Sequence, residues 1–137
     1  MKTAVLSSLT RYRDAGLLLL RLGLGAMMVF HGLPKLLGGP ERWEGVGGAM
    51  GNLGIELAPT FWGLMAACSE TVGGVLLALG LLFRPACLFL LATMSVAAIH
   101  HLSRGDGLAG ASHAIELGIV FFGLFFVGPG RLSVDGM

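Results

Sequence analysis

Four long apolar runs dominate this sequence, and each is close to the roughly 20 residues that a helix needs to cross the hydrocarbon core of a bilayer. They extend from about 16 to 37, 58 to 83, 85 to 102 and 112 to 127. The apolar residues are continuous rather than alternating, so the runs predict helices and not the strands of a barrel. We therefore expect an all-α membrane protein, a bundle of four transmembrane helices that forms one domain over residues 1–137.

The composition points to lipid as the surrounding medium. Of the 137 residues, 55% are hydrophobic and 12% are charged, whereas about a quarter of the residues in soluble domains are charged. Nine basic and eight acidic residues give a net charge of +1, so nucleic acid is not an expected partner. The chain is too short to add a soluble catalytic domain to four spans, and any chemistry must lie in the bundle or in a partner.

The breaks between the runs contain residues that stop helices, because glycine adopts the left-handed C-cap conformation and proline cannot continue a helix. The breaks are Gly38-Gly39-Pro40, Arg84-Pro85, Arg104-Gly105-Asp106-Gly107 and Gly128-Pro129-Gly130. Residues 41–57 follow the first break and have apolar residues at helical spacing, although their glycines weaken a helix. We expect a short, partly helical amphipathic segment there, between the first and second spans.

Basic residues near the helix ends predict the orientation, because they are retained on the cytoplasmic side. The N-terminus, the turn between the second and third spans and the C-terminal tail share one side. That side holds Lys2, Arg11, Arg13, Arg84 and Arg131, with Arg21 able to snorkel toward it, and the other side holds Lys35, Arg42 and Arg104. We expect both termini to lie in the cytoplasm.

Ionisable residues inside the spans are costly in hydrocarbon and need a partner, water or a function. They are Arg21, His31, Lys35, Glu70, His100, His101, His113 and Glu116. With cytoplasmic termini, all four histidines fall toward the outer side, and Glu70 lies about 18 Å along its helix from residue 58. Helical spacing places His31 with Lys35, and His113 with Glu116, on common faces, so that Lys35 can pair with either glutamate.

Two interpretations of these residues stay open. In the structural one, interhelical ion pairs hold the bundle in register and the histidines lie at the headgroup level. In the functional one, they form a polar site toward the outer leaflet that exchanges protons with a redox-active ligand or binds a quinone head group. The candidates for ligand binding or proton relay are Arg21, His31, Lys35, Glu70, Glu116 and His113. The pattern does not identify a catalytic residue.

Metal and thiol chemistry have little support in the sequence. His113 and Glu116 have the three-residue spacing of bundle metal sites in reverse order, which is a weak signal for a metal. Haem ligation by two histidines stays open, but there is no C-x-x-C-H motif. Cys68 and Cys87 differ in depth by more than about 15 Å, which predicts free thiols. With no dinucleotide fingerprint, P-loop or redox C-x-x-C, independent catalysis is the least supported function.

Several motifs resemble those of the DoxX family. Arg21-Leu22-Gly23 followed by His31-Gly32-Leu33-Pro34-Lys35 is similar to the first helix of that family. Residues 69–74 and 79–85 resemble its second helix and turn, Glu116 resembles the acidic residue of its fourth helix, and residues 128–135 resemble its ending. The resemblance implies a four-helix protein of a bacterial-type inner (plasma) membrane.

The DoxX resemblance also suggests a function, because the family takes its name from the membrane part of a thiosulfate:quinone oxidoreductase. It implies a subunit of a quinone-linked or thiol and oxidative-stress redox complex rather than an independent enzyme. Quinone is then the candidate cofactor, and redox subunits are the expected partners. The alternative is a non-enzymatic small transporter or a structural membrane subunit. The sequence does not decide whether the chain forms a homo-oligomer.

Overall fold

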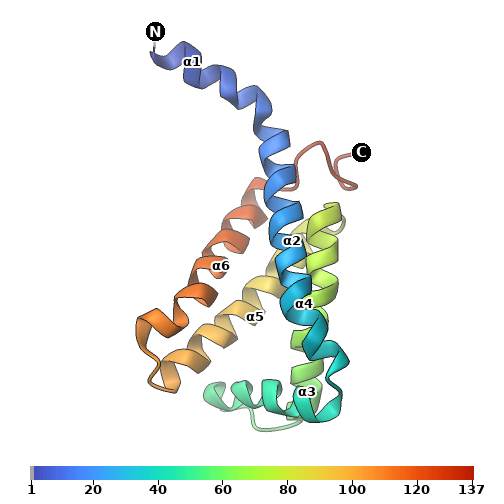
Figure 1. The fold of residues 1–137 in the computed structure, drawn as a ribbon, viewed down its shortest axis with the longest axis vertical. Helices are drawn as coiled ribbons and strands as arrows, with labels where there is room; N and C mark the ends of the chain where they lie inside the picture. The colour runs from blue at the N-terminus through green and yellow to red at the C-terminus, as the bar shows by residue number, and fades with distance from the viewer. Residues whose placement is uncertain (1) are drawn as a thin grey trace.

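All the regular secondary structure of the described residues is helical. A computed structural model describes residues 2–137, and the side chain of Lys2, counted above among the basic residues, lies outside the description. The elements are α1 (Lys2–Leu9), η1 (Thr10–Tyr12), α2 (Arg13–Leu37), α3 (Pro40–Gly47), η2 (Gly48–Leu53), α4 (Pro59–Leu79), α5 (Phe83–Ser103) and α6 (Gly107–Val127) (Figure 1).

Four helical segments are long and apolar enough to cross a membrane. They are Ala4–Leu37, Pro59–Leu79, Phe83–Ser103 and Gly107–Val127. The prediction of four membrane-spanning helices is therefore confirmed. The first segment has 34 residues, or about 51 Å at 1.5 Å per residue, so it is longer than the hydrocarbon core is thick. Figure 1 shows the excess as α1, which projects beyond the other helices.

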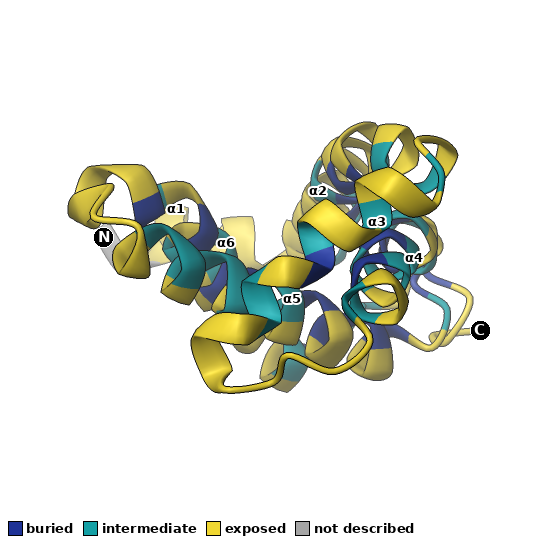
Figure 2. Cartoon of the chain, turned by 90° about the horizontal axis from the view of Figure 1, so that it is seen from below, coloured by how far each residue is buried: buried dark blue, intermediate teal, exposed yellow. Residues whose placement is uncertain are grey.

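The four long helices form two packed pairs. Helix α2 packs mainly against α4 and α5 against α6, and contact between α4 and α5 joins the pairs. Viewed from below, the pairs are the two arms of a V (Figure 2). Within residues 2–137, α2 and α6 do not pack against each other along their lengths.

Glycines allow α2 and α4 to approach closely. A Cβ atom added at Gly25 would lie 2.5 Å from the carbonyl oxygen of Gly74 and 2.8 Å from the Cβ of Ala78. A Cβ atom at Gly32 would lie 2.6 Å from the Cβ of Glu70. Such backbone-to-backbone packing replaces the hydrophobic drive that is missing between helices in lipid.

Two helix boundaries differ from the expected ones. The turn between α4 and α5 lies at residues 80–82, where Gly80 has φ = +67°, and not at Arg84-Pro85. Pro85 instead lies in the first turn of α5, where a proline does not remove a helical hydrogen bond. Helix α6 begins at Gly107 rather than near residue 112. The expected segment after the first span is helical, as α3 and η2.

The C-terminal tail, residues 128–137, folds back onto one end of the bundle (Figure 1). The Asp135 carboxylate accepts hydrogen bonds from the backbone N–H groups of Leu82 (3.0 Å), which precedes α5, and of Phe83 (2.9 Å), the first residue of α5. The Asp14 carboxylate accepts one from the N–H of Arg131 at 3.0 Å. The start of α2, the α4–α5 turn and the tail thus share one end, and α3, η2 and the α5–α6 turn lie at the other.

Candidate functional site

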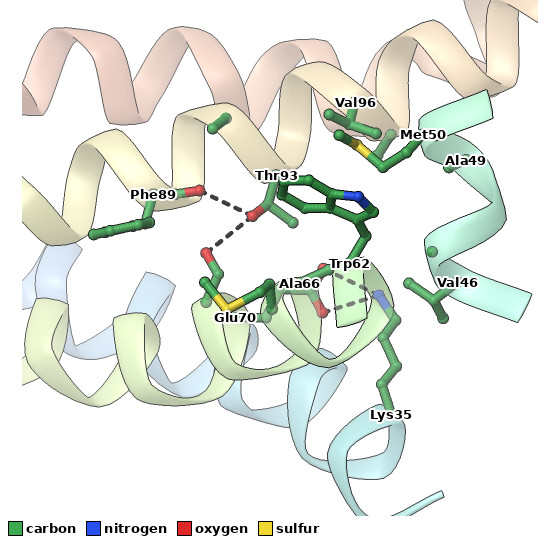
Figure 3. Close-up of a pocket in the computed structure, with 15 residues that line it drawn as sticks. Lys35, Val46, Ala49, Met50, Trp62, Ala66, Glu70, Phe89, Thr93 and Val96 are labelled. Atoms are coloured by element: carbon green, nitrogen blue, oxygen red, sulfur yellow. Dashed lines mark hydrogen bonds and ion pairs between the residues drawn. The ribbon is translucent and has the colours of Figure 1, made fainter. Parts of the chain in front are cut away.

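A cavity of about 310 Å³ lies between α4, α5 and the α3–η2 segment (Figure 3). Its walls are mainly apolar and include Val46, Met50, Trp62, Met65, Phe89 and Val96. Its polar groups come from Lys35, Ser69, Glu70 and Thr93. Met65 and Phe89 are 40% and 57% exposed, so the cavity opens sideways between α4 and α5, toward the bilayer.

The ion pair of Lys35 and Glu70 forms the charged end of this cavity. The Lys35 Nζ lies 3.0 Å from Glu70 Oε1 and 2.9 Å from Oε2. The Glu70 side chain is only 5% exposed and that of Lys35 is 28% exposed. Removing one member of such a pair leaves an uncompensated charge in a poorly hydrated place. The pair therefore joins α2 to α4 and also presents charge to the cavity.

Trp62 places an unused hydrogen-bond donor in the same cavity. Its indole extends from α4 toward α5 (Figure 3), and its N–H donates to no group among the described residues. In contrast, the indole N–H of Trp43 donates to the carbonyl oxygens of Lys35 (3.0 Å) and Leu36 (3.2 Å) and fastens α3 to the end of α2. The N–H of Trp62 is therefore available to a ligand that enters the cavity.

Hydroxyl groups of α4 and α5 contact each other in the wall of the cavity. Thr93 Oγ1 lies 2.9 Å from Ser69 Oγ and 2.9 Å from the carbonyl oxygen of Phe89. This contact links α4 to α5. It also places a hydroxyl beside the apolar wall.

His100 and His101 support the end of the bundle at which the cavity lies. Asn52 Nδ2 lies 2.9 Å from His100 Nδ1, which ties η2 to α5 next to the cavity. His101 Nδ1 lies 2.9 Å from an Asp106 carboxylate oxygen in the α5–α6 turn. The hydrogen bond from His101 lowers the pKa of Asp106 below its usual value, with a smaller contribution from the charge of Arg104.

Arg21 lies at the end of the bundle opposite the cavity. Its side chain is buried, at 1% exposure. It donates to the carbonyl oxygens of Pro129 (2.7 Å), Leu132 (2.7 Å) and Ala78 (3.3 Å). These contacts hold the C-terminal tail against α2 and α4. The structure thus places Arg21 apart from the other predicted site residues.

His31, His113 and Glu116 lie outside the cavity lining. The rings of His31 on α2 and His113 on α6 have centroids 5.7 Å apart and link the two arms of the V. Glu116 is exposed and forms no ion pair with any residue the structure describes. The sequence left Glu70 and Glu116 open as partners of Lys35, and in the structure Lys35 pairs with Glu70.

No metal-binding cluster of three or more His, Cys, Asp or Glu side chains is found among the described residues. Cys68 and Cys87 are free thiols, as predicted. The weak metal candidates His113 and Glu116 therefore gain no third ligand of these types within residues 2–137.

The sequence model of the DoxX family matches residues 16–102, which is more than half of the chain. The chain belongs to the DoxX family. This DoxX protein is also 30% identical over 136 residues to an uncharacterized protein of Haemophilus influenzae, with 95% of this chain and 96% of the relative covered. No solved structure matches it significantly. The family match contains Arg21, His31, Lys35 and Glu70, whereas Glu116 and the C-terminal tail lie beyond it.

Sequence reasoning did not identify Trp62, Ser69 and Thr93 as residues of the candidate DoxX site. A signal for Trp62 was present, because it precedes Glu70 by eight residues and therefore lies near the same face of α4. The signal for Thr93 was absent, since its place beside Ser69 depends on how α4 and α5 pack.

Proposed function

We propose that this DoxX protein is a membrane subunit of a quinone-linked redox complex, and that the cavity between α4 and α5 holds the quinone head group. The observation that carries the proposal is the nearly buried ion pair of Lys35 and Glu70 at the end of an apolar cavity that opens sideways. A ligand that fits has a small polar head and an apolar tail that remains in the lipid.

The lining residues fit such a head group in size and chemistry. A cavity of about 310 Å³ is at the small end of ligand sites, which are about 300–1,000 Å³, so the head group fits and the tail lies outside. The free N–H of Trp62 can donate to a quinone oxygen, and the ammonium of Lys35 can donate to the other or to Glu70. The Trp62 ring and Phe89 supply apolar surface to the ring of the ligand.

Lys35 and Glu70 would take part in proton transfer to the head group. A quinone, when bound, accepts two electrons and two protons. The Glu70 carboxyl group can carry these two protons one at a time to a ligand oxygen, and Lys35 stabilises the carboxylate each time a proton has left. The electrons would come from a redox partner subunit.

We also propose the orientation and location that the charge distribution supports. Both termini lie in the cytoplasm of a bacterial-type inner membrane. The cavity is at the opposite end of the bundle from the tail, so it is closer to the outer leaflet.

The test is to purify the wild-type protein in a mild detergent and to quantify extracted quinone and co-purified subunits by mass spectrometry. We expect quinone in the wild-type sample and about tenfold lower occupancy in Glu70→Gln, the effect of about 1.4 kcal/mol. Glu44→Gln removes an exposed carboxylate from α3 and should retain the wild-type occupancy. A wild-type protein that neither retains quinone nor takes it up when it is added in excess would contradict the proposal.

The structural interpretation of the ion pair is tested with the same samples. Trp62→Phe removes an N–H that bonds to no described residue, so it should lower quinone occupancy at unchanged thermal stability. If Glu70→Gln loses stability and quinone together while Trp62→Phe keeps both, the pair serves only to join α2 to α4.

A further inference from the structure

Helix α6 presents an exposed seam on the side away from α5. Its buried residues face α5 and are Ala111, Ala114, Gly118, Phe121 and Leu124. The seam consists of Ala109, Ser112, Glu116, Ile119, Gly123 and Phe126. All of them are exposed except Ser112, which is half-buried. The spacing alternates between three and four residues, which is the pattern of two helices that pack with a left-handed crossing.

Glu116 makes this seam unsuited to contact with lipid alone. It lies nine residues into α6, about 14 Å from the start of the helix and therefore near mid-depth. Its side chain is exposed and forms no ion pair with a described residue. An ionised group at the bilayer centre costs about 2.5–3.5 kcal/mol even on insertion scales, and such groups usually have a polar partner.

Neighbouring helices of the same chain do not provide this partner. Lys35, the basic residue that the sequence offered to either glutamate, is bonded to both carboxylate oxygens of Glu70. Helix α2 does not pack along α6 within the described residues. Whatever covers the seam must come from outside the chain.

We infer that the seam is covered by α6 of a second copy of this chain, related by a twofold axis along the membrane normal. Such a contact is self-complementary, because Glu116 of each copy can bond with His113 of the other. Side chains on a helix lean toward its N-terminus, so the Glu116 carboxylate is carried toward the level of residue 113. His113 is exposed on α6 and can serve as the donor.

Gly123 allows the two helices to approach closely in the part of the seam near the C-terminal end of α6. A Cβ atom added at Gly123 would meet nothing within 4 Å in the chain, so its small size has no role inside the single copy. Small residues in such exposed positions let transmembrane helices come into backbone contact. The charged pair and the glycine thus support the same partner through different contacts.

The test is disulfide cross-linking in native membranes. Ala109→Cys lies at the outer end of the seam, and Leu37→Cys is the matched control, because Leu37 is 76% exposed at the same end of the bundle but on α2. The wild-type protein, with Cys68 and Cys87, gives the background. We expect covalent dimers from Ala109→Cys only. Equal cross-linking of both variants, or none of Ala109→Cys, would overturn the inference and leave lipid or another protein on this face.

Two further changes in the Ala109→Cys background test the contacts themselves. Gly123→Leu fills the seam and should abolish the cross-link, whereas Gly23→Leu, at an open position on α2, should not. Glu116→Gln should lower the dimer fraction about tenfold, since it weakens two symmetric hydrogen bonds. Unchanged dimers in Gly123→Leu would contradict the seam, and this result does not depend on quinone binding.

Discussion

Arg21 and Glu70 are two ionisable residues that this protein buries by different means. Arg21 is surrounded by backbone carbonyl oxygens from α4 and the tail, whereas Glu70 has a counter-charge in Lys35. A guanidinium donates in several directions, which suits it to three carbonyl groups. Arg21 does not line the cavity, whereas Glu70 does, so we assign Arg21 to the fold and Glu70 to the site.

We predict that Arg21→Met destabilises the protein by about 3 kcal/mol, because carbonyl oxygens near the tail lose a charged donor and each such loss costs about 1–3 kcal/mol. Thermal unfolding in detergent measures the change. Arg11→Gln, at an exposed position, is the control and should unfold like the wild type. Quinone occupancy per folded Arg21→Met chain should stay near the wild-type value, and a selective loss of quinone would return Arg21 to the site.

The individual helices were largely predictable from the sequence, but their ends and partners were not. Continuous apolar runs indicate spans because lipid requires helices. The true α4–α5 turn at Gly80 was hidden inside an apolar run, since a C-cap glycine in leucine-rich sequence looks like one more apolar residue. Helical spacing placed Lys35 within reach of Glu70 or Glu116, and only the packing of α2 on α4 selects Glu70.

The contact between α2 and α4 supplies a prediction with an internal control. Gly32→Val should destabilise the protein by about 1–3 kcal/mol, because added atoms would press on Glu70 and Thr71 and overpacking a tight contact has that cost. Gly23→Val is on the same helix, where an added Cβ meets nothing within 4 Å. We expect its thermal unfolding to match the wild type, and equal behaviour of the two variants would contradict the close packing.

At the scale of the whole molecule, the two ends of the bundle are built differently. The tail, the α4–α5 turn and the start of α2 are tied together by Arg21, Asp14 and Asp135. The opposite end has the α3–η2 segment, the cavity and the histidines. One end is thus braced by hydrogen bonds to backbone, and the other has space for a ligand between α4 and α5.

The uneven distribution of basic residues between the two ends predicts a membrane topology that a reporter fusion can measure. A reporter active only in the cytoplasm should give signal at the C-terminus, because the basic residues are concentrated at the end where the tail lies. The same reporter inserted at Gly105, in the α5–α6 turn, should be silent. Signal from the turn and silence from the C-terminus would invert the orientation and place the cavity near the inner leaflet.

Tryptophan fluorescence tests quinone binding in the cavity most directly, because the chain has two tryptophans and only Trp62 lines the cavity. The variant Trp43→Phe retains Trp62 as the sole indole, and Trp62→Phe retains Trp43. Titration with a short-tailed quinone should quench Trp62 in a saturable way and Trp43 only in proportion to quinone concentration. Saturable quenching that is equal in both variants, or absent from Trp43→Phe, would contradict a quinone site between α4 and α5.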